Sequence, residues 1–302
     1  MSDLGRKSVP RCQKLSVESI MVKSSSPMRI SLYTCVRNGL YFDYHVVEMV
    51  KHHLPLVDEI VIFDGNSTDG TREALEHIDP KVKVFSEDWG EPDGEEWFAN
   101  FKNVARQRCS GDWCILLDPD EFIPEWEFER IRQCISKSVQ PIIRLDWIHF
   151  YGNYRVFNAN PGKKRWAEFK YQVHRNEPGM FVWGDGSNVK LNGESYDSSV
   201  APERFICHHF GLVRWSSRLR QKLRIVGRIK KRRLNWLYLP GFIFRLLPYN
   251  WFDTDFLSDL EIYDGQLIEP VRRNPKEFTR DNMKLYKYLM NQKRISDSPY
   301  LG

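Results

Sequence analysis

Short apolar segments that alternate with helical ones constrain the fold of this chain more than any other feature. Residues 29–36, 59–63, 81–85 and 113–117 are rich in β-forming side chains, and helical patterns lie between them, the first over residues 41–53. This alternation predicts βαβ units with right-handed crossovers, and therefore an α/β fold with a mostly parallel, Rossmann-like central sheet flanked by helices. In such sheets ligands bind beyond the carboxyl ends of the strands.

Length and composition set the broad class of protein. The chain has 302 residues, of which 41% are hydrophobic, and this is enough to bury a substantial core. It has no run of about 18 apolar residues and no apolar signal segment, so we expect a soluble protein in the cytoplasm. Six cysteines without a C-x-x-C pair are expected to stay reduced in that compartment.

An apolar strand ends abruptly in three carboxylates, those of Asp118, Asp120 and Glu121. Manganese and magnesium ions prefer oxygen ligands, and a cation at a strand end would neutralise the phosphates of a bound nucleotide. Asp118 and Asp120 are therefore candidate metal ligands. An acidic turn that caps the following helix explains the same residues, so the cluster alone leaves both interpretations open.

A second motif lies one βα unit earlier, where residues 61–71 read VIFDGNSTDGT. Gly65 and Asn66 permit a tight turn, and the polar residues after them can cap the next helix. Asp64 has no such structural explanation. Its carboxylate is suited to accept hydrogen bonds from the edge of a nucleobase.

Together the two motifs resemble the family 2 glycosyltransferases of the GT-A fold, which carry an Asp-x-x-Ser-Thr-Asp-Gly-Thr loop and then an Asp-x-Asp motif. The resemblance covers roughly residues 28–125. It implies metal-dependent transfer of a sugar, with inversion, from a nucleoside diphosphate sugar, a UDP-sugar being favoured. Asp64 would contact the base, and Asp118 and Asp120 would hold Mn²⁺ or Mg²⁺, with Asp118 also on the nucleotide side. Arg37 and Arg106 are further candidates for nucleotide contacts.

A third motif, ICHHFGLVR over residues 206–214, resembles a His-aromatic-Gly segment found late in many GT-A domains. There the histidine completes the metal site, and this favours His209 as the third ligand. We expect His208 to be a packed, hydrogen-bonded side chain. Arg214 and Lys222 are expected to steady the departing diphosphate, because cations compensate the charge that develops there.

Sugar transfer with inversion needs a carboxylate that takes the proton of the acceptor hydroxyl. Asp185 is the first candidate because it lies in a loop of the expected acceptor region, where Trp183 is able to stack on a sugar. Glu168 is the second candidate. An ordinary surface position explains each of these acids as well.

Composition and the resemblance together divide the chain into parts. Residues 1–27 are predicted to be a disordered lead. Residues 28–212 are predicted to form the GT-A catalytic domain, with a nucleotide-binding half to about residue 125 and an acceptor half from 126, in which we expect mostly loops over residues 151–205. Residues 213–302 are predicted to be a basic, mostly helical extension.

Positive charge is concentrated in this extension. Ten Lys or Arg residues lie between Arg214 and Arg233, and no acidic residue lies between Glu203 and Asp253. Apolar side chains at helical spacing make the segment amphipathic, so we expect residues 214–252 to contact an anionic membrane surface near a glycan, lipid-linked or protein acceptor. Packing of the apolar stripe on the catalytic domain explains the pattern equally well.

Two other functions are compatible with parts of the sequence. A basic nucleic-acid-binding or membrane-binding protein on an inactive Rossmann-like scaffold would leave Asp64 and the acidic pair unexplained, so binding to nucleic acid is not expected. A sugar nucleotidyltransferase uses a related scaffold and a metal. The sequence lacks the glycine-rich loop with basic residues that this chemistry needs behind the first strand.

Overall fold

The structure, a computed structural model, describes most of the chain. The described residues are 28–91, 94, 96–164, 166–194, 203–229, 250–252, 254, 257–279 and 282–295. The predicted disordered lead and most of the basic segment after residue 229 lie outside them.

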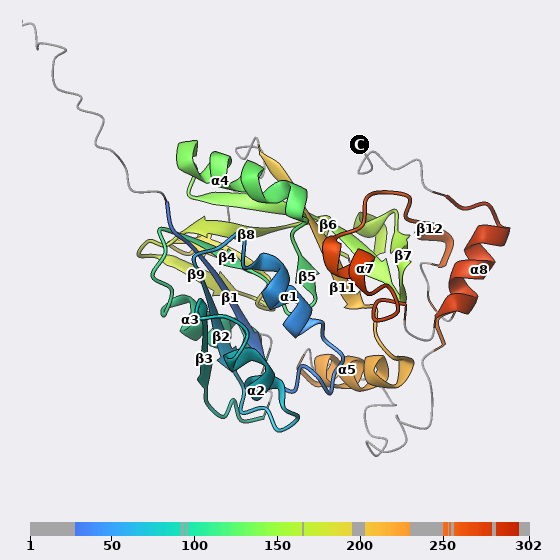
Figure 1. The fold of residues 1–302 in the computed structure, drawn as a ribbon, viewed down its shortest axis with the longest axis horizontal. Coiled ribbons are helices and arrows are strands. Elements are labelled where there is room, and N and C mark those ends of the chain that lie inside the picture. The colour runs from blue at the N-terminus through green and yellow to red at the C-terminus, as the bar shows by residue number, and fades with distance from the viewer. Residues whose placement is uncertain are drawn as a thin grey trace, which may run out of the picture.

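The first part of the described chain alternates strands and helices as predicted (Figure 1). Four strands are parallel and follow the order β4-β1-β2-β3 in the sheet. Because β1 lies next to both β2 and β4, the carboxyl ends of these strands meet at one edge of the sheet. The elements are β1 (Ile30–Val36), α1 (Val46–His53), β2 (Glu59–Asp64), α2 (Thr71–Glu76), β3 (Val82–Ser86), α3 (Trp97–Arg106) and β4 (Trp113–Leu116).

Side chains of β1 alternate between two hydrophobic cores, one on each face of the sheet. Ile30 and Leu32 belong to the core that includes the buried residues of α1, whereas Tyr33 and Cys35 belong to the core under α3. Every residue of β1 is buried. A strand covered by helices on both faces has no solvated side, which explains why β1 contains no charged residue.

Helix α1 begins later than the sequence predicts, at Val46 instead of Tyr41. Asp43 has a φ of 58°, and this left-handed conformation is incompatible with a helix at that point. The carboxylate of Asp43 accepts a hydrogen bond from the backbone N–H of Trp215 at 2.9 Å. The segment before α1 is therefore a loop that the C-terminal part of the chain holds in place.

The second part of the described chain extends the same sheet, mainly with antiparallel strands. β8 pairs with β4 and β6, β7 joins β6, and β11 lies parallel to β6 and antiparallel to β5. The 3₁₀ segment Glu125–Glu127 precedes α4. The elements are β5 (Glu121–Phe122), α4 (Phe128–Lys137), β6 (Ile142–Tyr151), β7 (Asn153–Asn158), β8 (Phe169–Arg175) and β11 (Arg204–Leu212).

The prediction of a loop-rich region over residues 151–205 is wrong. Strands β7 and β8 lie within it, together with β9 (Met180–Trp183) and β10 (Asn188–Leu191), which form a small antiparallel sheet of their own beside α3. Charged side chains interrupt β7 and β8 at Arg155, Lys170 and Arg175. Pairing with β6, which is distant in sequence from β8, stabilises strands that their own side-chain pattern does not predict.

The described part of the C-terminal extension packs against residues 28–212, the predicted catalytic domain. It contains α5 (Ser216–Ile229), β12 (Leu260–Ile262), α7 (Glu269–Arg273) and α8 (Met283–Asn291), and β12 pairs with β7 at the edge of the sheet. Leu219 and Leu223 of α5 belong to a hydrophobic cluster that includes residues of α8, and Ile225 packs on the core under α3. No helix in the described ranges is long and apolar enough to cross a membrane.

Candidate active site

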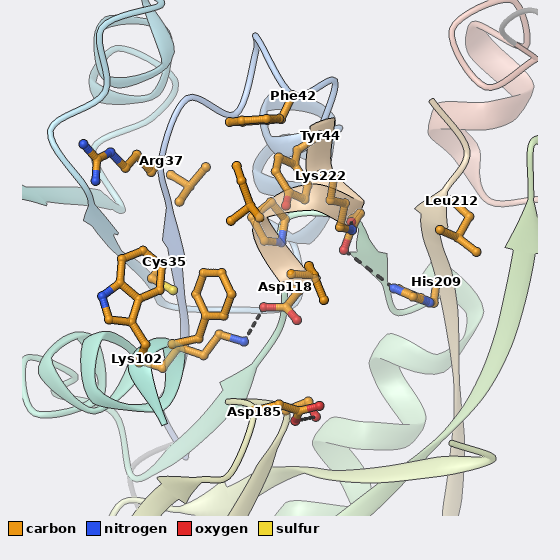
Figure 2. A pocket seen from close by; sticks show the side chains of 18 of the residues that line it. Cys35, Arg37, Phe42, Tyr44, Lys102, Asp118, Asp185, His209, Leu212 and Lys222 are labelled. Atoms are coloured by element: carbon orange, nitrogen blue, oxygen red, sulfur yellow. Dashed lines mark hydrogen bonds and ion pairs between the residues drawn. The ribbon is translucent and has the colours of Figure 1, made fainter. Parts of the chain in front are cut away.

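A cavity of about 710 Å³ lies beyond the carboxyl ends of β1 and β4 (Figure 2). One side is lined by the loop after β1, including Arg37, and by Trp89 and Lys102. The other side is lined by residues of β6, β8 and β11. The cavity thus lies where ligands bind in parallel α/β sheets, and its volume is within the range of sites for small molecules and cofactors.

Asp120 is the electrostatic centre of this cavity. Its side chain is 3% exposed, and Oδ2 accepts hydrogen bonds from Nη2 of Arg214 at 2.7 Å and from Nζ of Lys222 at 2.9 Å. Burial alone would raise the pKa of Asp120, but Lys222, His209 and Arg214 hold it well below its usual range. Asp120 is therefore a carboxylate at neutral pH.

Two strand pairings bring His209 next to Asp120. β11 pairs with β5 so that His209 lies opposite Glu121, and the N–H of Phe210 donates to the carbonyl of Asp120 at 2.8 Å. Nε2 of His209 lies 3.8 Å from Oδ1 of Asp120, which is too long for a hydrogen bond. Burial lowers the pKa of His209 well below its usual value, so the ring is neutral.

Asp118 has a different partner from Asp120. Its carboxylate forms an ion pair with Lys102, and Nζ of Lys102 also donates to the carbonyl of Gly186 at 2.8 Å. Burial would lower the pKa of Lys102, but the acidic groups around it, Asp118 foremost, together raise the pKa instead. Figure 2 shows Lys102 directed at Asp118, with His209 and Lys222 farther along the cavity.

The predicted trio of metal ligands is brought together only in part. No three His, Cys, Asp or Glu side chains within the described ranges converge as a metal site. Asp120 and His209 do fit a divalent cation as a pair, because a carboxylate oxygen and a neutral ring nitrogen lie 3.8 Å apart without a hydrogen bond between them. Mg²⁺ commonly takes one or two carboxylates and completes its shell with substrate phosphates and water.

Asp185 lines the cavity and lies in the loop between β9 and β10. Its Oδ1 accepts a hydrogen bond from Oγ of Ser187 at 2.5 Å, and Nζ of Lys170 donates to the same hydroxyl at 2.6 Å. Trp147 lies across this region, with Nζ of Lys170 at 5.5 Å from its ring centroid. The cavity therefore contains a carboxylate and an aromatic ring that are connected through Ser187 and Lys170, and such groups are able to bind a hydroxylated substrate.

Residues 44–190 match the family model of glycosyl transferase family 2. The chain carries a family 2 glycosyltransferase domain. The predicted GT-A fold is confirmed, since the matched segment covers most of the α/β sheet that frames the cavity. No curated protein sequence matches the chain.

Solved structures of glycosyltransferases are distantly similar to the chain. TarS 1–349 of S. aureus, in complex with UDP, is 14% identical over 67% of this chain and 65% of TarS, with a TM-score of 0.40. The mannosyltransferase PcManGT of Pyrobaculum calidifontis, in complex with GDP-Man and Mn²⁺, is 18% identical over 41% of this chain and 36% of that chain, with a TM-score of 0.30. The chain thus spans less than two thirds of either relative, and similarity at this level assigns it no ligand.

Four of the predicted site residues do not line the cavity of the glycosyltransferase domain. Arg214 is fully buried and acts on the cavity through Asp120. Arg106 lies in the last turn of α3, and its Nη1 contacts Asn176 Oδ1 at 3.4 Å. Glu168 is exposed to solvent. These placements do not support direct contacts of Arg106 with the nucleotide or of Glu168 with the acceptor.

Asp64 is the fourth. It lies opposite Ser86 in the pairing of β2 with β3, and Oγ of Ser86 donates to its Oδ2 at 2.9 Å. The backbone N–H of Ser67 donates to the same oxygen at 2.9 Å, and the Ser67 hydroxyl donates to Oδ1. The carboxylate thus holds the loop together, so this buried residue has a structural explanation after all. Contact between Asp64 and a base stays a prediction.

The residue after Asp64 has a direct effect on the cavity wall. A Cβ on Gly65 would lie only 2.5 Å from the indole of Trp89, so the absence of a side chain lets Trp89 pack flat on the loop. Trp89 stacks on Phe101 with centroids 4.7 Å apart and rings at 9°. Arg37 donates to the carbonyl of Gly90 at 3.0 Å and thereby holds the loop that contains Trp89.

Replacing Gly65 with alanine is expected to lower the free energy of unfolding by about 1–3 kcal/mol, because the rigid indole of Trp89 must move. Chemical denaturation measures this change. Gly162→Ala is the matched control, since its Cβ would meet only the flexible side chain of Glu168. Equal stability of both variants would contradict the packing argument.

Several aromatic residues that line the cavity were not predicted as site residues, among them Trp89, Trp147 and His149. Trp147 and His149 alternate with apolar residues in β6 and therefore lie on one face of it. This alternation is a signal, but β6 is apolar enough to be explained as an ordinary core strand. His208 agrees with its prediction, since it is fully buried and its Nε2 lies 3.3 Å from the hydroxyl of Tyr263.

Proposed function

We propose that this chain transfers a sugar, with inversion, from a nucleoside diphosphate sugar to an acceptor hydroxyl, and that Asp120 and His209 hold a divalent cation, Mn²⁺ or Mg²⁺. The family 2 domain supports the reaction class. The observation that carries the proposal is the cluster of Asp120, His209 and Lys222 in one cavity at the carboxyl ends of the strands.

Each residue has a role that follows from its position. The cation, when bound, supplies positive charge to the phosphates of the donor. Lys222 lines the cavity and would supply a second positive charge to the same phosphates. Arg214 is paired with Asp120 and keeps that carboxylate ionised and oriented. Arg37 lies at the nucleotide end of the cavity with its side chain 38% exposed, where a base or ribose would contact it.

Asp185 is proposed to take the proton of the acceptor hydroxyl as that oxygen attacks the anomeric carbon. Asp185→Asn is expected to lower kcat about 100-fold or more, because the amide does not accept the proton. Nucleotide binding should be retained. Glu168→Gln, which changes an exposed acid outside the cavity lining, is the control. An Asp185→Asn enzyme with normal kcat would show that another group is the base.

Calorimetric titration of UDP and GDP, with and without Mn²⁺, tests the donor site. We expect one nucleotide to bind in a metal-dependent manner, and UDP is the first to test. Asp120→Ala should abolish the effect of the metal because it removes a ligand. Asp64→Ala measures separately whether the loop contributes to base binding. Absence of binding by either nucleotide to the folded protein in Mn²⁺ would contradict the proposal.

Contact with an anionic membrane surface through residues 214–252 stays a prediction. Trp215 is 48% exposed, whereas Leu219, Leu223 and Ile225 face the protein. Within the described residues the apolar stripe of α5 thus packs on the domain, as the alternative explanation expects. Residues 230–249 lie outside the described part of the chain. Co-sedimentation of the protein with phosphatidylserine vesicles at low and high salt tests this contact.

A further inference from the structure

Two imidazole rings contact each other across neighbouring strands at the cavity. β6 and β11 are parallel and pair His149 with His209. Nδ1 of His149 lies 2.8 Å from Nδ1 of His209, and Nε2 of His149 lies 2.7 Å from the carbonyl oxygen of Ala167. Both nitrogens of His149 are therefore engaged, one by a backbone group and one by the other ring.

The chemistry of these partners decides where the protons are. The carbonyl oxygen of Ala167 only accepts hydrogen bonds, so Nε2 of His149 carries the proton. His149 is 4% exposed, and burial favours the neutral ring, so with its proton on Nε2 the Nδ1 atom is an acceptor. Nδ1 of His209 must then donate to it. In a neutral ring a proton on Nδ1 leaves Nε2 of His209 with a free lone pair.

That lone pair lies beside a second acceptor. Nε2 of His209 is 3.8 Å from Oδ1 of Asp120, and neither atom has a proton to offer the other. The rings are held in place by aromatic packing, since Trp147 stacks on His209 at 4.7 Å and Trp166 meets His149 edge-on at 4.8 Å. Two acceptors held side by side in the cavity wall are poised for a cation.

We propose that His149 is a positioning residue that fixes His209 as the Nδ1–H tautomer and so directs an unprotonated Nε2 at Asp120. The binding of a divalent cation by Nε2 and Asp120 rests on the proposed function. The tautomer itself does not depend on it. A ligand histidine whose other nitrogen donates to a fixed partner is oriented and made more basic, and loss of such a partner typically lowers metal affinity 10- to 100-fold.

Nitrogen NMR of the protein labelled with ¹⁵N-histidine tests the tautomers directly, without metal or substrate. We expect the His209 ring in the Nδ1–H form and the His149 ring in the Nε2–H form, with the His209 signals assigned by their loss in His209→Gln. The Nε2–H form of His209 in the wild-type protein would overturn the proposal.

Two substitutions separate the hydrogen bond from the bulk of the ring. His149→Asn places a carbonyl oxygen near the position of Nδ1, so His209 should keep its Nδ1–H form. His149→Leu removes the acceptor, and His209 should lose its preference for that form. His174→Asn is the matched control, because His174 is a fully buried histidine that contacts the Arg175 carbonyl and the Tyr33 hydroxyl outside the cavity lining. An unchanged His209 tautomer in His149→Leu would overturn the proposal.

Titration of Mn²⁺ alone, followed by the electron paramagnetic resonance signal of the free ion, measures the consequence. His149→Leu is expected to bind Mn²⁺ at least about tenfold more weakly than the wild type, with His149→Asn and His174→Asn close to the wild type. Equal affinity of all variants would overturn the positioning role. Failure of the wild-type protein to bind Mn²⁺, with the expected tautomers observed, would contradict the proposed metal site and leave the tautomer assignment intact.

Discussion

Replacement of Asp120 with asparagine is expected to lower the free energy of unfolding by about 3–5 kcal/mol, which is typical when one partner of a buried ion pair is removed. The amide has the shape of the carboxylate but no charge, so Arg214, which is fully buried, and Lys222, which is 19% exposed, would lose their counterion. Urea denaturation at neutral pH measures the change.

The pH dependence of this difference follows from the pKa of Asp120. Burial opposes ionisation, but Lys222, His209 and Arg214 lower the pKa below the ordinary value of 3.8. The stabilisation is therefore fully present above about pH 3.8 and is lost as the pH falls toward the folded-state pKa. The gap between the wild type and Asp120→Asn should narrow in strong acid. Asp88→Asn, at an exposed pair 3.9 Å from Arg37, is the control and should change stability by less than about 1 kcal/mol.

Replacement of Lys222 with methionine is expected to lower kcat about 100-fold, with a smaller change in KM. Lys222 lines the cavity and is the cation of α5 that donates to Asp120, at 2.9 Å. Its charge should matter most when the diphosphate departs, since a preorganised cation stabilises charge that develops in the transition state. Initial rates with the nucleotide sugar identified by calorimetry measure both constants.

Arg218→Met is the matched control for this experiment. Arg218 lies one turn earlier on α5, with its guanidinium 3.9 Å from the centroid of Tyr41 and outside the cavity lining. Both substitutions remove one positive charge from the same helix, so a general effect of charge would change both enzymes alike. A loss confined to KM in Lys222→Met would place its charge in donor binding instead of in the transition state.

The parallel strands were predictable because each is encoded by side chains that are neighbours along the chain. Strands β1, β2, β3 and β4 are short apolar runs between helical segments, and each lies within about two residues of its predicted position. β7 and β8 were not predicted, because charged residues interrupt them and pairing with strands distant in sequence, β12 for β7 and β4 for β8, stabilises them. The start of α1 was missed because a single residue, Asp43, adopts a left-handed conformation.

The residues of the candidate site also differ in whether local sequence predicted them. The acidic motif was found because Asp118 and Asp120 directly follow β4, and the end of a strand in a parallel sheet determines where such residues lie. His209 was favoured through a family resemblance. His149 and Lys102 were not selected as site residues, since nothing near them in sequence indicates which groups they contact.

By itself the sequence determined the alternation of strands and helices, the sheet edge at which the carboxylates emerge and the positive charge of α5. These features depend on side chains that are neighbours along the chain. Only the tertiary structure decided the partner of each charge, since Asp120 meets Lys222 across 102 residues and His149 meets His209 across 60. Such contacts depend on strand register and helix orientation, which the packing of the whole core determines.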